Sequence, residues 1–229
     1  MYDLKSYKSH YLSSMKIKFI RNIFFLFFMS IYSLGARPIS YPGGWTVMQM
    51  NDFNSHSLHV HYTLSPKYSF GYRGEYWRKK DWQFHGGQFN YLIKRLNNPK
   101  SQANLYFKSG LGLALSDFRD LKNKTEPAFF SGLSFDWEDR RYFTKYENRI
   151  NYSPEIDKFF IQKGRIGIAP YIGNYGDLHT WLMLQVDHMP KEKNKIVYTP
   201  MLRFFKADYL AEIGRNNIGD LLFNFVKRF

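Results

Sequence analysis

From Trp45 to the C-terminus, apolar and polar residues alternate in short segments separated by turn residues. Side chains of a β-strand point in turn to the two faces of a sheet, so this period of two predicts strands. In one segment, Leu58 and Val60 alternate with His59 and His61. We find no stretch with the 3.6-residue period of an amphipathic helix. The pattern therefore predicts an all-β fold in which each strand has an apolar and a polar face.

Turn residues divide this region into about twelve strands. The expected strands span residues 45–51, 57–64, 68–78, 82–95, 102–115, 127–137, 141–152, 159–171, 179–188, 195–206, 209–215 and 219–229. The first segment is short and the break at residues 206–208 is weak, so ten strands is the alternative. An even number brings both termini to one end of the sheet, where tight turns at 65–67, 138–140 and 206–208 are expected. The longest connection, from Ser116 to Glu126, then lies at the other end.

The last expected strand is apolar and aromatic along one face. Leu221, Phe223, Phe225 and the terminal Phe229 all fall on it. This strand resembles the C-terminal assembly signal of bacterial outer-membrane β-barrels, and it departs from that pattern at Lys227, where an apolar residue is usual. The resemblance implies a closed, antiparallel, up-and-down transmembrane β-barrel in the outer membrane of a Gram-negative bacterium. It also implies that the barrel-assembly machinery binds the C-terminal strand.

The N-terminal region has the layout of a secretory signal peptide. A basic segment begins at Met15, an almost wholly apolar run follows at residues 23–34, and small residues lead to Ala36. The run is shorter than the about 20 residues that a membrane-spanning helix needs. We expect Met15 to be the true start and cleavage to occur after Ala36 or one residue earlier. The chain then consists of a signal region at 1–36 and a barrel domain at 37–229.

Charge narrows the choice of partners. Removal of residues 1–36 takes away five basic residues and one acidic residue, so 33 − 5 = 28 basic and 19 − 1 = 18 acidic side chains remain, a net charge of +10. The basic residues are scattered through the expected strands, unlike the clustered patch of a nucleic-acid-binding surface. We therefore expect outer-membrane lipids and the phosphates of lipopolysaccharide as partners, and no nucleic acid.

Composition favours a barrel in a lipid membrane. Aromatic residues make up 20% of the chain, yet its mean hydropathy is −0.47, which is polar. A membrane barrel combines these properties because only every second residue of its strands faces lipid. The chain has no cysteine, so disulfides cannot hold the fold. A secreted soluble β-protein, such as a sandwich or a lipocalin-like barrel, also alternates in this way and is the alternative.

Two methionines and two histidines form a candidate metal site. Met48 and Met50 lie on the first expected strand, and His59 and His61 lie on the polar face of the second. Hairpin pairing in which residue numbers sum to about 109 sets Met50 opposite His59 and Met48 opposite His61. Thioether sulfur and imidazole nitrogen together suit a soft or borderline ion such as copper. The hypothesis is therefore an association with copper, with no cofactor needed for folding.

A lipid-modifying outer-membrane enzyme, of the phospholipase or lipid A deacylase type, is the second functional hypothesis. Such enzymes need a serine beside a histidine and an acid or amide that orients the imidazole. Ser57 and His59 share one strand face, with Asp52 and Asn54 nearby. Their order is the reverse of the His-x-Ser of barrel phospholipases, and the pair is expected to face the lumen rather than lipid. A role without catalysis is therefore preferred.

The polar strand faces also carry charged residues that we expect in the lumen. They are Arg73, Glu75, Lys94, Lys108, Lys145, Glu147, Arg149 and Arg203. Opposite charges on neighbouring strands can close a narrow barrel, and an excess of basic groups can select anions. Barrels of about eight strands are filled by side chains and those of about 16 hold open channels, so twelve strands permit a narrow passage. The leading hypothesis is therefore a small structural or porin-like outer-membrane barrel with a narrow solute passage.

Overall fold

The computed structural model describes residue 39 and residues 41–174 and 176–229. The expected signal peptide at 1–36, with its start at Met15, lies outside these residues. The described part contains one short 3-10 helix, η1 (Arg119–Leu121), and twelve strands: β1 (Trp45–Asn51), β2 (Ser55–Ser65), β3 (Tyr68–Trp77), β4 (Trp82–Asn97), β5 (Ser101–Ser116), β6 (Lys124–Asp139), β7 (Tyr142–Ser153), β8 (Asp157–Ile168), β9 (His179–His188), β10 (Ile196–Lys206), β11 (Tyr209–Arg215) and β12 (Leu221–Arg228). Within it, no helix has the length and apolar character to cross a membrane.

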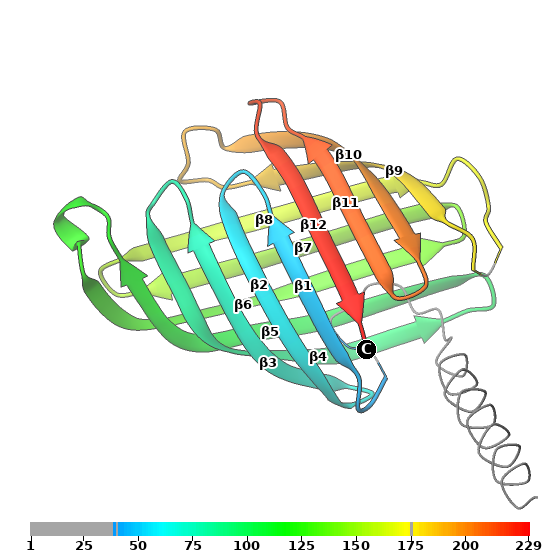
Figure 1. The fold of residues 1–229 in the computed structure, drawn as a ribbon, viewed down its shortest axis with the longest axis horizontal. Coiled ribbons are helices and arrows are strands. Elements are labelled where there is room, and N and C mark those ends of the chain that lie inside the picture. Colours follow the sequence, from blue (N-terminus) through cyan, green and yellow to red (C-terminus); the bar gives the residue numbers. More distant parts are fainter. Residues whose placement is uncertain (1–38, 40, 175) are drawn as a thin grey trace, which may run out of the picture. The chain divides into compact units, whose positions relative to one another are not determined.

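The strands form one closed antiparallel barrel (Figure 1). Each strand pairs with its neighbours in the sequence, and β1 pairs with β12 to close the sheet, with Met48 opposite Val226. The backbone N–H of Phe229 donates to the carbonyl of Trp45 at 3.0 Å, and the N–H of Trp45 donates back at 3.2 Å. The predicted all-β closed barrel of about twelve strands is confirmed, and the alternative of ten strands is wrong.

Strand boundaries follow the predicted ones to within three residues at each end. The short turns between β2 and β3, β6 and β7, and β10 and β11 lie at the same end as the two strand termini that close the barrel, as expected from an even strand number. The β5–β6 connection lies at the other end, as expected, but the prediction that it is the longest connection is wrong. The β8–β9 connection at residues 169–178 lies at the terminal end and is longer than the β5–β6 connection at 117–123 at the other end.

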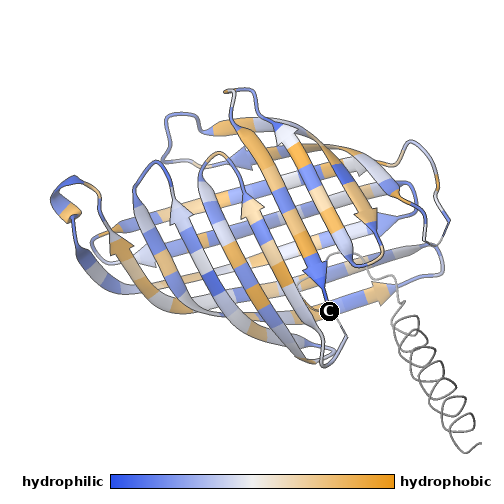
Figure 2. Ribbon diagram, viewed as in Figure 1, coloured by the Kyte–Doolittle hydropathy of each residue, from blue (hydrophilic) through white to orange (hydrophobic). Residues whose placement is uncertain are grey.

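Hydrophobic and hydrophilic residues alternate along the strands of the barrel (Figure 2), and their burial shows an apolar outer face and a polar inner face. Each of the twelve strands exposes at least one large apolar side chain, and three of the most exposed are Phe70 at 54%, Ile166 at 60% and Leu111 at 72%. Inward-facing neighbours such as Ser69 and Asn90 are fully buried although they are polar. The barrel is therefore inverted relative to a soluble protein, because its polar groups lie inside.

Lys227 interrupts the aromatic face of β12 on the outside of the barrel. Its Nζ lies 5.1 Å from the ring centroid of Tyr209 and 4.4 Å from that of Phe229. A lysine can cover apolar surface with its aliphatic stem while its ammonium contacts aromatic faces. These contacts accommodate a charged residue within the aromatic C-terminal strand.

An aromatic cluster fills part of the lumen where β3, β4 and β8 turn, at the end opposite the termini. The ring centroids of Trp77 and Phe159 are 4.6 Å apart, although β3 and β8 are not neighbours in the sheet. Phe130 lies over Gly110, where an added Cβ would come within 2.2 Å of the ring. The cluster consists of Trp77, Trp82, Phe84, Ala114, Ala128, Phe130, Phe159, Ile161 and Met189. Side chains from opposite walls therefore narrow the lumen here.

One predicted luminal residue is misplaced by a β-bulge. The pairing of β4 with β5 shifts between Leu92 and Lys94, which leaves Ile93 as an extra residue. An extra residue reverses which side chains face inward beyond it. Lys94 is therefore exposed, and Arg95 takes the inner face instead, where its Nε donates to Asn104 at 2.7 Å.

Candidate functional site

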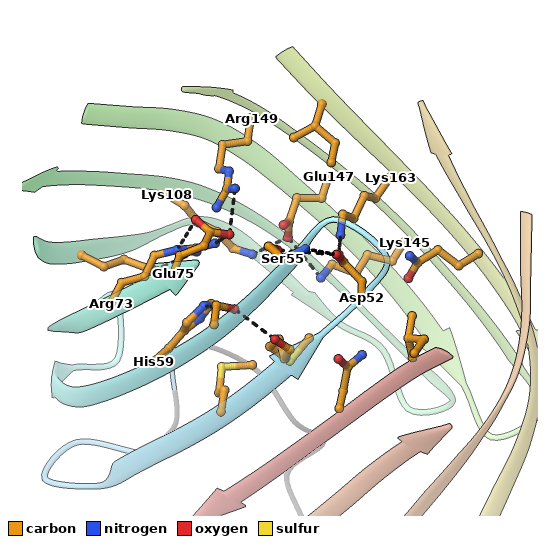
Figure 3. Close-up of a pocket in the computed structure, with 18 of the residues that line it drawn as sticks. Asp52, Ser55, His59, Arg73, Glu75, Lys108, Lys145, Glu147, Arg149 and Lys163 are labelled. Atoms are coloured by element: carbon orange, nitrogen blue, oxygen red, sulfur yellow. Dashed lines mark hydrogen bonds and ion pairs between the residues drawn. The ribbon is translucent and has the colours of Figure 1, made fainter. Parts of the chain in front are cut away.

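A cavity of about 140 Å³ lies in the barrel lumen (Figure 3). Side chains from β1, β2, β3, β4, β5, β7, β8, β9 and β12 surround it. Its lining residues are Met48, Met50, Asp52, Ser55, Ser57, His59, His61, Arg73, Glu75, Trp77, Gln88, Lys108, Lys145, Glu147, Asn148, Arg149, Ile161, Lys163, Arg165, Gln185, Leu222 and Asn224. The inward faces of the strands predicted from the sequence therefore converge on one space.

Met48, Met50, His59 and His61 form one side of this cavity, which we call the neutral wall. All four belong to the β1–β2 hairpin and line the cavity, as predicted. The predicted register is wrong by two residues, because Met48 lies opposite His59 and Met50 lies opposite Ser57. His61 lies opposite Thr46. The wall thus brings together the residues expected from the sequence in a different pairing.

The two histidines of the neutral wall differ in their hydrogen bonds. His59 Nε2 lies 3.0 Å from Ser57 Oγ, and the rings of His59 and His61 have centroids 5.8 Å apart. His61 is completely buried, and neither of its ring nitrogens has a hydrogen-bond partner among the residues that the structure describes. A buried polar group without a partner costs about 1–3 kcal/mol. The packing around His61 alone does not explain why this side chain is buried at such a cost.

The side of the cavity formed by β5, β7 and β8 is the charged wall, with Lys108, Lys145, Glu147, Arg149, Lys163 and Arg165. Lys108 on β5 contacts Glu147 on β7 at 2.5 Å, and Lys145 contacts the same carboxylate at 3.1 Å. One acid is thus shared by two bases. The arrangement leaves a positive charge on this part of the wall.

Glu75 on β3 joins the two sides of the lumen. Its side chain is only 3% exposed and accepts from Arg73 Nη2 at 2.8 Å and from Arg149 Nη2 at 3.0 Å. Both guanidinium groups also lie over the ring of Phe130, at 4.9 and 5.3 Å from its centroid. Because β3 and β7 are not adjacent, this pairing crosses the barrel interior. Figure 3 shows the two arginines converging on this carboxylate.

Asp52, in the turn between β1 and β2, makes a second link across the lumen. Its carboxylate contacts Lys163 on β8 at 2.5 Å and accepts from the backbone N–H groups of Asn54 and Ser55, both at 2.9 Å. Burial by itself would raise the pKa of Asp52, but Lys163 and these two donors outweigh it and lower the pKa to about 2. Asp52 therefore stays ionised and ties the turn to β8.

Glu212 on β11 forms an ion-pair network that the sequence did not reveal. It contacts Arg165 at 3.0 Å and Arg203 at 2.7 Å, and accepts from Asn224 at 2.7 Å. Arg203 was expected in the lumen, and this position is confirmed. Arg203 and Asn224 lie directly opposite Glu212 on the neighbouring strands β10 and β12, and only Arg165 on β8 is distant from it in the sequence.

Basic residues outnumber acidic ones around the cavity. The lining includes six basic side chains, Arg73, Lys108, Lys145, Arg149, Lys163 and Arg165, and three acidic ones, Asp52, Glu75 and Glu147. The balance is 6 − 3 = +3 with histidine neutral. A low-dielectric wall concentrates the field of such a surplus, so the cavity favours anions over cations.

The residues of the enzyme hypothesis come together only in part. Ser57 and His59 are within hydrogen-bonding distance, as their shared face predicted. Asp52 instead binds Lys163, and the amide nitrogen of Asn54 lies 2.8 Å from the sulfur of Met189. Among the described residues, no carboxylate or amide is hydrogen-bonded to His59. The pair therefore lacks the orienting group that an activated serine requires.

Metal sites built from oxygen and imidazole ligands also lack a basis in the described residues. No group of three or more histidine, aspartate or glutamate side chains in that part of the chain is arranged to hold a metal ion. The methionines of the neutral wall fall outside that ligand set. Only a site that includes thioether sulfur remains compatible with the predicted residues.

Comparison with known proteins gives structural matches of low similarity, and two of them are described here. No family model matches the sequence, and no curated protein matches it. A solved structure described as "KdgM porin in complex with disordered oligogalacturonate" has 9% identity and a TM-score of 0.48, with 81% of this chain and 98% of that chain covered. A second, described as "KdgM porin", has 8% identity and a TM-score of 0.46, with 81% and 96% covered. At this degree of similarity, no conclusion about function passes from those porins to this chain.

Proposed function

We propose that this protein is a small porin-like barrel of the bacterial outer membrane whose narrow lumen admits small anionic solutes. The surplus of three positive charges around the luminal cavity is the observation that carries the proposal. The outer face of the barrel supports the proposed membrane location, and the lumen supports the proposed passage of anions.

The outer face supports a membrane location. Soluble monomers rarely expose contiguous apolar patches larger than a few hundred Å². Here every strand of a closed barrel exposes large apolar side chains, so the apolar surface surrounds the molecule. A secreted soluble β-protein with this surface would aggregate. The buried polar interior and exposed apolar exterior instead match the alternation of membrane barrels.

The lumen supports passage of small anions only. A cavity of about 140 Å³ is smaller than the about 300–1,000 Å³ of typical ligand pockets, so bulky solutes do not fit. The aromatic cluster narrows the path further. A surplus of basic side chains along the lumen attracts anions and repels cations of the same size. The expected solutes are therefore small and negatively charged.

Insertion of the purified protein into planar lipid bilayers tests the proposal. We expect a small conductance in KCl that is carried mainly by chloride. The same preparation is run unboiled and boiled on a gel, and a shift in mobility on boiling shows that the barrel was folded. A folded, inserted protein with no conductance would remove the passage and leave a structural barrel held by its luminal ion pairs. A preference for potassium would contradict the charge argument.

The expected partners follow from the same location. The C-terminal strand pairs directly with β1, so its recognition by the barrel-assembly machinery would precede closure of the barrel. Lipopolysaccharide and outer-membrane lipids would contact the outer face. Crosslinking during assembly, with a photoreactive group in place of Phe223, tests the first contact; capture of the assembly machinery supports it, and its absence during productive assembly argues against it.

A further inference from the structure

We propose that the neutral wall holds one monovalent soft metal ion, of the Cu(I) or Ag(I) class, between the sulfur of Met48 and the imidazoles of His59 and His61. Met48 and His59 are direct cross-strand partners, and His61 lies one position further along the same face of β2. Met50 is the next inward residue on β1 and supplies a second sulfur. This site is independent of whether the lumen conducts.

The geometry of an antiparallel pair brings these side chains within reach of one ion. Residues directly opposite have Cβ atoms about 4.5–5.5 Å apart, and diagonal neighbours lie about 7–8 Å apart, within reach of long side chains. The ring centroids of His59 and His61 are 5.8 Å apart, and their planes meet at 71°. All four residues also line the cavity, so an ion that enters the lumen can reach them.

His61 provides an independent observation that points to a ligand. It is completely buried, lines the cavity, and has two ring nitrogens without a hydrogen-bond partner in the described part of the chain. Neutral imidazole has a lone pair on one ring nitrogen, and that lone pair is what binds a metal. His59 has one nitrogen engaged by Ser57 Oγ, which leaves the other for coordination and fixes the ring. Both imidazoles can therefore coordinate a metal ion, His61 through a ring nitrogen that lacks a hydrogen-bond partner and His59 through the nitrogen that does not contact Ser57.

The surrounding charge decides which metal ions fit. Arg73 lies opposite His59 on β3, and the cavity lining as a whole carries a surplus of positive charge. Each unit of charge on a bound cation is opposed by this field, so a divalent ion is opposed twice as strongly as a monovalent one. The three carboxylates of the lining already pair with basic groups. Soft thioether ligands favour Cu(I) and Ag(I), whose bonds to sulfur offset the unfavourable field.

Equilibrium dialysis of the folded barrel in detergent with silver nitrate, in chloride-free buffer, tests the site. We expect one tightly held Ag(I) per chain and a rise in melting temperature on binding. Zn(II) and Ni(II) at the same concentration should neither compete nor raise the melting temperature. X-ray absorption of the silver complex should show sulfur as well as nitrogen in the coordination shell.

Substitutions locate the ion within the barrel. Met48→Leu keeps the side-chain volume and removes the sulfur, and His61→Leu removes both ring nitrogens. Each should weaken silver binding by about tenfold or more, since even outer-shell changes cost about 10–100-fold. His85→Leu, on the outer face, and Met201→Leu, a buried methionine outside the cavity lining, are the matched controls and should bind as tightly as the natural protein. The gel shift on boiling confirms that each variant is folded.

Three results would overturn the site. The first is a folded natural protein that retains no silver after dialysis. The second is Met48→Leu and His61→Leu variants that bind silver as well as the controls do. The third is Zn(II) binding equal to Ag(I) binding, because it would contradict the role assigned to the positive surroundings.

Discussion

The two walls of the luminal cavity differ in the charge and chemistry of their side chains. The neutral wall, on β1 and β2, carries thioethers and imidazoles, whereas the charged wall, on β5, β7 and β8, carries lysines, arginines and one glutamate. Two carboxylates from other parts of the lumen pair with the charged wall, Glu75 on β3 with Arg149 and Asp52 in the β1–β2 turn with Lys163. The difference shows that cohesion and charge preference come from the same few ion pairs. The four residues of the neutral wall are not members of these ion pairs.

Removal of the Glu75 charge should weaken the ion pairs that cross the lumen most severely. Glu75→Gln leaves Arg73 and Arg149 inside the barrel without a carboxylate, and losing one partner of a buried ion pair costs about 3–5 kcal/mol. Urea unfolding in detergent, followed by tryptophan fluorescence, measures the loss in free energy of unfolding. Glu155→Gln, whose side chain is 65% exposed, is the control and should change it by less than about 1 kcal/mol. Equal effects of the two substitutions would show that the ion pairs of Glu75 across the lumen do not stabilise the barrel.

The contribution of the Asp52–Lys163 ion pair to the stability of the barrel should depend on pH. The pKa of Asp52 is about 2 in the folded barrel and about 3.8 when the group is free, so its contribution is complete above about pH 4 and is lost as the pH falls towards 2. The corresponding free energy is about 2 kcal/mol. Asp52→Asn should therefore lower the stability by that amount at pH 7. The difference in melting temperature between the natural protein and this variant should shrink between pH 4 and pH 2, and a constant difference would contradict the assignment.

The neutral wall should tolerate substitution far better than the charged wall. Met48→Leu conserves volume and breaks no hydrogen bond, so its cost should stay below about 1.5 kcal/mol. The same urea unfolding experiment gives this value beside that of Glu75→Gln. A loss as large as that of Glu75→Gln would mean that the neutral wall is a structural core and would remove the contrast between the walls.

The strands and their faces could be predicted because a period of two leaves a direct trace in the sequence. Register could not. The predicted pairing of Met50 with His59 assumed a longer turn, whereas β2 begins at Ser55 and Met48 faces His59. The bulge at Ile93, which exposes Lys94, has no sequence marker. Cross-lumen partners were equally hidden, because contacts such as Lys163 with Asp52 depend on the curvature of the closed barrel rather than on neighbouring strands.

The reversal potential in a KCl gradient tests most directly the claim that the charged wall sets the ion preference of the lumen. Lys145 shares Glu147 with Lys108, so Lys145→Glu lowers the lining charge from +3 to +1 while Lys108 remains beside Glu147. Met50→Leu, on the neutral wall, keeps the charge at +3 and is the control. We expect chloride selectivity in the natural protein and in Met50→Leu, and a clear shift towards potassium in Lys145→Glu. An unchanged reversal potential in Lys145→Glu, or potassium selectivity in the natural protein, would contradict the account.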